Sequence, residues 1–184
     1  DFIFENRFRS NNYLNLKYNI GNNWNFELQI ESYLPKALLN FSPNFKKTGI
    51  STFNIQYNKD NLNLSLGNFY DQFGSGMILR SWEDKDLGIN NSIRGLSAKY
   101  RINDEINISA LAGNQKKGFK YSKGFIAGFD AEIDISEILN NDYTLITGIS
   151  YVGRNDENSS NDSYSKMTNL FSTRLDFSSS SFYS

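Results

Sequence analysis

Apolar and polar residues alternate along most of this sequence, and that period limits the fold more than any other feature. In segments 13–20 and 24–31 apolar side chains occupy every second position, and a Gly21-Asn22-Asn23 turn joins the two segments. A period of two places these side chains on one face of a β-strand. Phe2 and Phe4 suggest an extended piece before these segments. The alternation returns in seven later segments: 53–57, 62–66, 96–102, 106–112, 125–135, 145–151 and 167–177. We predict an all-β protein of about nine or ten antiparallel strands, as a single domain over residues 1–184.

The connections between these segments alternate in length. Short turns such as 59–61 and 103–105 follow one segment, and long connections such as 35–49 and 68–95 follow the next. In an up-and-down meander, alternate connections emerge at the same end, so one end has tight turns and the other has long loops. Outer-membrane β-barrels show this asymmetry. The pattern predicts an antiparallel up-and-down transmembrane β-barrel, with this chain as part of a larger barrel.

Two further features favour a membrane barrel over a soluble β-sandwich, which also alternates and stays open as the alternative. The face opposite the apolar one is strongly polar in nearly every segment, as a water-filled lumen requires. Aromatic residues also gather near the ends of segments, where an interfacial girdle would lie: Tyr13, Trp24, Tyr33, Tyr57, Tyr70, Tyr100, Tyr143 and Tyr151.

Composition excludes several classes of function. The chain contains no cysteine and no histidine, which removes thiolate metal sites, cysteine nucleophiles and Ser-His-Asp triads. The net charge of −1 gives no overall field to attract nucleic acid. No apolar run approaches the roughly 18 residues of a membrane-spanning helix. We therefore expect a non-enzymatic protein without catalytic residues, cofactor or metal site, and no nucleic acid among its partners.

The connection 68–95 differs in character from the others. A connection of this length is either functional or disordered, and its many aromatic and aliphatic residues favour an ordered loop. We expect the loop to dock into the lumen or onto a partner, or to form a constriction or ligand site, through these residues: Asp71, Arg80, Trp82, Glu83, Asp84, Asp86 and Arg94. The alternative is a loop ordered only by its own ion pairs and by packing of Trp82.

The polar faces of the segments carry charges of both signs. The mixture fits a lumen filled by cross-strand ion pairs or by an inserted loop better than a pore selective for one sign. We predict five lumen-facing charges: Lys99, Arg101, Asp130, Glu132 and Asp134. The three carboxylates share one face of one segment and need cationic neighbours or water. Lys99 and Arg101, two strands earlier, are the predicted partners if the register brings them level.

Several stretches of the sequence resemble a known family. They are residues 8–14 (FRSNNYL), 31–35 (ESYLP), 67–84 (GNFYDQFGSGMILRSWED) and 87–95 (LGINNSIRG). They resemble an uncharacterised outer-membrane β-barrel family of the Bacteroidota, a Gram-negative group, whose members are longer than this chain. The resemblance covers most of residues 8–135, its central block is specific, and over 140–184 it is only general. It implies a barrel in the outer membrane with a C-terminal portion beyond this chain, and it implies no activity.

These observations lead to several hypotheses for function. The leading one is a non-enzymatic outer-membrane β-barrel that acts as a subunit or accessory of a larger envelope complex, for export or outer-membrane protein assembly. Its partners would be outer-membrane lipid and other outer-membrane proteins. The second is a porin-like diffusion channel for small solutes. An outer-membrane hydrolase is weakened by the absence of histidine, and a soluble β-rich binding module is the remaining alternative.

Overall fold

The described residues form one long antiparallel sheet. The computed structural model describes residues 9–38, 48–139, 143–155 and 167–179, so the extended piece expected at Phe2 and Phe4 lies outside them. The sheet has 10 strands, β9 included, and its main path follows the chain in the order β1-β2-β3-β4-β7-β8-β10-β11-β12. This arrangement confirms the predicted all-β, antiparallel, up-and-down architecture.

The long strands cover most of the segments in which alternation was found. They are β1 (Asn12–Ile20), β2 (Trp24–Ser32), β3 (Thr48–Lys59), β4 (Leu62–Phe69), β7 (Ile93–Arg101), β8 (Ile106–Lys117), β10 (Phe125–Asp134), β11 (Thr144–Asn155) and β12 (Met167–Ser178). The shorter elements are β5 (Glu83–Asp84), β6 (Ile89–Asn90), β9 (Lys120–Tyr121) and α1 (Ile135–Leu139). Within the described residues, no helix has the length and apolarity needed to cross a membrane.

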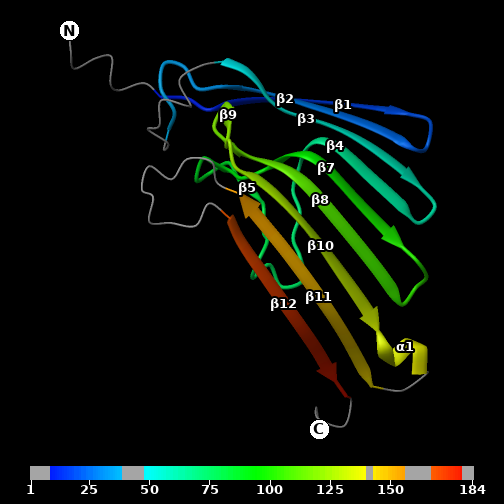
Figure 1. Ribbon diagram of the computed structural model, residues 1–184. Helices are drawn as coiled ribbons and strands as arrows, with labels where there is room; N and C mark the ends of the chain where they lie inside the picture. The colour runs from blue at the N-terminus through cyan, green and yellow to red at the C-terminus, as the bar shows by residue number, and fades with distance from the viewer. Residues whose placement is uncertain (1–8, 39–47, 140–142, 156–166, 180–184) are drawn as a thin grey trace.

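The sheet is curved and open. β1 and β12 lie at its two edges, and in the described part of the chain these strands do not pair with each other (Figure 1). The short connections lie at one end of the sheet, on the right of the view, and the strand ends that the long connections join lie at the opposite end. The alternation of short and long connections therefore sorts them to opposite ends, as the sequence predicted.

Two predicted loops are shorter than expected. β4 runs to Phe69 and β7 begins at Ile93, so the connection between them is 70–92, and it contains the β5–β6 hairpin. β8 continues to Lys117 and turns at Gly118 (φ 64°) into β9, inside the predicted loop 114–123. The alternation stops before these strand ends because Phe69 and Ile93 break it at β4 and β7 and because residues 114–117 of β8 are all polar. A period-two pattern therefore underestimates the strands at this end.

Burial in this sheet is the reverse of that in a soluble protein. On the convex face, large apolar side chains are exposed, including Leu66 (53 %), Ile149 (53 %) and Phe171 (76 %). On the concave face, polar side chains such as Asn54 (6 %) and Ser97 (3 %) are buried. Soluble proteins expose scattered apolar residues, but a whole sheet face of them marks a surface that contacts something other than water.

Some of the aromatic residues gather at the short-turn end of the convex face. Trp24 packs against Tyr57 with ring centroids 4.7 Å apart, and Tyr143 packs against Phe177 at 5.8 Å. Tyr13 and Tyr33 do not join this band, since their rings contact each other at 6.2 Å and Tyr33 is buried. Aromatic contacts of the convex face therefore occur at the short-turn end and around Tyr151, whose ring lies 4.8 Å from that of Phe171, whereas Tyr13 and Tyr33 pack in the interior.

Candidate functional site

The connection between β4 and β7, residues 70–92, lies across the concave face and contacts strands at both edges of the sheet. We call it the crossing loop. Near one edge, the Nζ of Lys85 lies 5.0 Å from the ring centroid of Tyr13 on β1, and Gln29 on β2 donates to Glu83 at 3.5 Å. At the other edge, Gly74 lies against Arg174 on β12. The loop therefore connects the two open edges through its own contacts.

Phe73 anchors the crossing loop by filling a buried socket whose base is the backbone of Gly128. Its side chain is 2 % exposed. A Cβ built on Gly128 of β10 would lie 2.8 Å from the Phe73 ring, so the ring occupies the space that a side chain would fill. Leu111 on β8 and Val152 on β11 pair with Gly128 from either side and are both buried. Phe73 is thus a knob that fits only because residue 128 lacks a side chain.

The socket belongs to a larger apolar patch on the otherwise polar concave face. Towards the long-loop end, several strands place an apolar residue where the alternation calls for a polar one: Phe69, Ile93, Leu111, Ile126 and Val152. Phe73 and Leu79 of the crossing loop complete this buried cluster, and Ile78 packs against it. The breaks in alternation were the sequence signal for the docking position, and sequence reasoning missed it.

The tip of the crossing loop is a small hairpin with its own hydrogen bonds. The Ser81 amide donates to the Asp71 carbonyl at 2.8 Å, and the Phe73 amide donates to the Leu79 carbonyl at 3.1 Å. The Asp71 carboxylate accepts hydrogen bonds from Ser97 at 3.0 Å and from Lys99 at 2.8 Å, both on β7. Because Asp71 is 6 % exposed, these bonds tie the base of the hairpin to the sheet.

A second contact holds the loop near β12. The guanidinium of Arg174 binds the Asp130 carboxylate through two hydrogen bonds of 2.7 and 3.0 Å, and it binds Glu132 at 3.0 Å. Arg174 reaches β10 across Gly148 of β11, where a Cβ would lie 2.5 Å from the guanidinium carbon. Gly74 of the crossing loop lies on the same guanidinium. Two glycines therefore leave room for one arginine between the sheet and the loop.

The carboxylates on β10 are neutralised differently from the prediction. The register does bring Lys99 level with Asp130, through β8. Lys99 nevertheless pairs with Asp71 of the crossing loop, and Arg174 is the cation that binds Asp130. The structure thus differs from the expectation that Lys99 and Arg101 serve these carboxylates. The reason is that the crossing loop supplies Lys99 with a carboxylate of its own.

A buried ionic cluster lies at the long-loop end, and sequence reasoning missed it too. Lys116 and Glu31, with side chains 1 % and 2 % exposed, lie 3.7 Å apart. Lys116 also hydrogen-bonds to Ser51, and the Tyr33 hydroxyl donates to Glu31 at 2.6 Å. The pKa of the Tyr33 phenol is raised, mainly by burial and secondly by the hydrogen bond to Glu31, so this group stays protonated. The cluster joins β2, β3 and β8 across the concave face.

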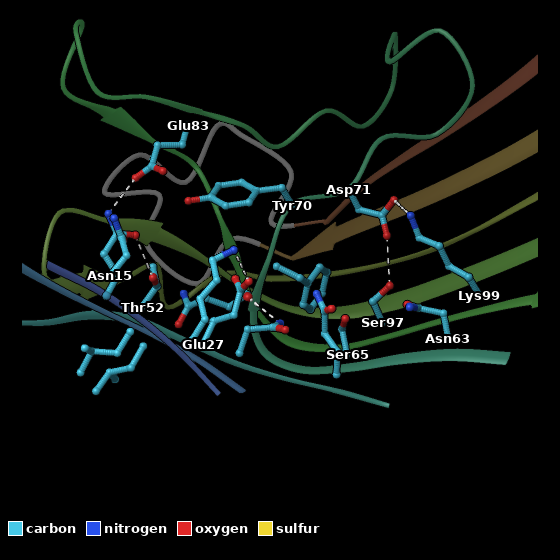
Figure 2. Close-up of a pocket in the computed structure, with 18 of the residues that line it drawn as sticks. Asn15, Glu27, Thr52, Asn63, Ser65, Tyr70, Asp71, Glu83, Ser97 and Lys99 are labelled. Atoms are coloured by element: carbon cyan, nitrogen blue, oxygen red, sulfur yellow. Dashed lines mark hydrogen bonds and ion pairs between the residues drawn. The ribbon is translucent and has the colours of Figure 1, made fainter. Parts of the chain in front are cut away.

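Between the crossing loop and strands β1–β4 and β7 lies a polar cavity of about 600 Å³. We call it the polar cavity. Figure 2 shows Tyr70 lying between Glu83 and Asp71 on the loop side, with Thr52 and Ser65 on the strand side. Of the loop residues predicted from sequence, Asp71 and Glu83 line this cavity, together with Lys85 and Lys99.

The other predicted loop residues do not line the polar cavity. The Arg80 guanidinium lies 5.9 Å from the centroid of the Trp82 ring. Asp84 accepts a hydrogen bond from the Leu87 amide at 2.9 Å. Asp86 is exposed, and the Arg94 guanidinium lies 4.8 Å from the rings of both Phe53 and Tyr121. Arg80, Asp84 and Arg94 thus contact the loop or its surroundings.

The predicted lumen charges gather in a second cavity of about 550 Å³, nearer the short-turn end. It is lined by four of the five predicted charges: Lys99, Arg101, Asp130 and Glu132. Asp134 instead accepts a hydrogen bond from Ser136. The described residues contain no group of three or more acidic side chains placed to hold a metal ion.

Fold and site together define an all-β protein whose antiparallel up-and-down sheet is covered on its polar face by its own loop. The chain belongs to DUF6029, a family of unknown function, whose model matches residues 3–184. The match extends beyond residues 8–135, most of which the resemblance in the sequence covered, and it fits the expectation of an uncharacterised family. A search found no matching curated protein and no matching solved structure.

We expect Phe73→Ala to release the crossing loop. The change empties a buried socket, and removing a buried phenylalanine costs about 3–5 kcal/mol. Hydrogen exchange should therefore accelerate at the backbone amides of residues 73 and 76, which bond within the loop tip. Met77→Ala, in the same loop but at an 84 % exposed residue, is the matched control and should leave exchange unchanged. Equal exchange in both variants would show that the socket does not hold the loop.

Proposed function

We propose that this chain forms the wall of an outer-membrane β-barrel and acts, without enzymatic activity, as a subunit or accessory of a larger envelope complex. The observation that carries the proposal is the inverted burial of the sheet. Its apolar residues are exposed on the convex face, and its polar residues are buried on the concave face. Lipid outside and a polar, loop-filled lumen inside would satisfy both faces.

The extent of the apolar face supports lipid as its environment. Exposed apolar side chains occur on strands from one edge of the sheet to the other, for example Leu16 on β1, Leu96 on β7 and Leu175 on β12. A docking surface for one protein partner is a patch, whereas lipid covers a whole face. The aromatic residues at the short-turn end, with Trp24 and Tyr57 in contact, fit the membrane–water interface.

The open edges support a role within an assembly. In a bilayer, unpaired strand edges have no water to bond their amides and carbonyls, so a spanning sheet must close. β1 and β12 do not pair with each other among the described residues. We propose that strands of another protein in the complex pair with these edges. The mixed charges and the anchored loop fit a filled lumen in such an assembly.

A second candidate function is the diffusion of small solutes. The observation that favours it is the presence of a polar cavity on the concave face at about 600 Å³ and a second one at about 550 Å³, both beside the crossing loop. If the loop narrows a lumen without sealing it, these spaces form parts of a path. Stable single-channel conductance of the purified protein in a planar bilayer would favour this function.

The facing of the sheet is tested with arginine substitutions on neighbouring strands. Phe129→Arg on β10 places a charge on the convex face, at a residue that is 46 % exposed. On a lipid face this costs about 2–4 kcal/mol at the midplane, so the folded yield in lipid vesicles should fall sharply. Ser109→Arg on β8 is the matched control, because residue 109 lies opposite Asp130 on the polar face. Equal yields would contradict the assignment of the convex face to lipid.

The proposed complex is tested by gentle extraction of the native protein from its membranes in mild detergent. We expect other outer-membrane proteins to co-purify in reproducible, near-stoichiometric amounts, identified by mass spectrometry. The amounts should not change when Met77, an exposed loop residue, is replaced by alanine. Recovery of the protein alone, in repeated extractions, would contradict the subunit role and would favour the diffusion channel.

A further inference from the structure

The polar cavity has the properties of a ligand site. Its volume of about 600 Å³ lies within the range of small-molecule pockets, which is roughly 300–1,000 Å³. Strands supply one wall, and the crossing loop, held by the Phe73 socket, supplies the other. Because both walls are fixed to the same sheet, the cavity is largely formed before a ligand arrives.

The charges that line the polar cavity cancel in pairs. Among the described residues they are three lysines and three acidic residues. Lys17 pairs with Glu27 at 2.6 Å, Lys99 pairs with Asp71 at 2.8 Å, and Lys85 lies 3.9 Å from Glu83. A site for an anion or a cation keeps an excess of the opposite charge. The pairing therefore favours an uncharged ligand.

Neutral hydrogen-bonding groups remain after the charges are paired. Thr52, Asn54, Gln56 and Ser65 line the cavity with hydroxyl and amide groups. The amide nitrogen of Asn54 donates to the Asn68 carbonyl at 2.8 Å, but its side-chain oxygen has no partner within the described part of the chain. Since Asn54 is 6 % exposed, this acceptor is buried, and buried acceptors without a donor are rare. The oxygen itself has almost no accessible surface, so the side chain must turn toward the cavity to meet a donor that the ligand supplies.

Tyr70 adds an aromatic surface to these groups. It lies just after β4, is 42 % exposed, and its ring extends over the cavity between Glu83 and Asp71 (Figure 2). A ligand with many hydroxyls and an apolar C–H face satisfies amides and a tyrosine ring together, because the ring packs on the C–H face while the amides bond the hydroxyls. Sugars have both features.

We propose that the polar cavity binds an uncharged saccharide, with Tyr70 packing on a sugar ring and Asn54 accepting a hydrogen bond from a sugar hydroxyl. The site goes beyond the barrel function and does not depend on it, because strands and loop of this chain alone enclose the cavity. A protein that proves soluble would still have the site, so the two proposals fail separately.

Isothermal titration calorimetry on the purified folded protein tests the site. The probes are four neutral disaccharides: maltose, lactose, cellobiose and chitobiose. We expect saturable one-to-one binding, millimolar or tighter, of at least one of them. Asn54→Leu and Tyr70→Ala should each weaken that binding by about tenfold or more. Tyr70→Phe, which keeps the ring, should retain it.

Asn107→Leu is the matched control for the calorimetry. Asn107 lies on β8 and lines the second cavity instead, so binding should stay as in the unchanged protein. Since Tyr70 lies outside the strands, Tyr70→Ala and Tyr70→Phe keep the test valid if Asn54→Leu fails to fold. The proposal is overturned if none of the four sugars binds, because the cavity would then hold only water. It is also overturned if Tyr70→Ala binds as well as Tyr70→Phe, or if glucose 6-phosphate binds more tightly than every neutral sugar.

Discussion

The contact between Phe73 and Gly128 determines how the rest of the concave face is organised. Without a side chain at residue 128, the ring of Phe73 reaches the backbone of β10 between Leu111 and Val152. That anchor fixes the hairpin tip of the crossing loop, and the fixed tip brings Gly74 onto Arg174. The crossing loop also supplies the second wall of the polar cavity, where Asp71 bonds to Ser97 on β7 and Glu83 accepts from Gln29 on β2. Loss of the Phe73 contact would free the hairpin tip, while these bonds would still hold the rest of the loop.

The two faces of the sheet pose opposite physical problems. The concave face is polar, and the crossing loop and the cross-strand pairs satisfy its charges, as Arg174 does for Asp130. The convex face is apolar and has no cover among the described residues, as Phe171 at 76 % exposure illustrates. A lipid exterior around a polar interior would suit both faces. The proposal of a membrane barrel follows from this pair of faces, and the saccharide site follows from the cavity alone.

The sequence predicted the strands better than the site. Strict alternation, as in Leu62, Leu64 and Leu66, reports one face against the other and led to the sheet and its meander. It does not show which strands contact a loop. The breaks in alternation at Leu111 and Val152 were therefore not interpreted, although these residues belong to the apolar patch on which the crossing loop docks. Partners of charges also depend on that loop. Asp71 pairs with Lys99, which lies 28 residues further along the chain. The periodicity of the sequence gives no information on such a contact.

The chain has two tryptophans, and they report on the two faces separately. Trp24 belongs to the convex face, and Trp82 belongs to the crossing loop. The measurement is fluorescence of the Trp82→Phe and Trp24→Phe variants in vesicles whose lipids carry bromine on the acyl chains, because bromine quenches a tryptophan that it touches. We expect strong quenching in the variant that keeps Trp24 and little in the one that keeps Trp82. Equal quenching of both tryptophans, or quenching of neither, would contradict a lipid-facing convex surface with the loop inside.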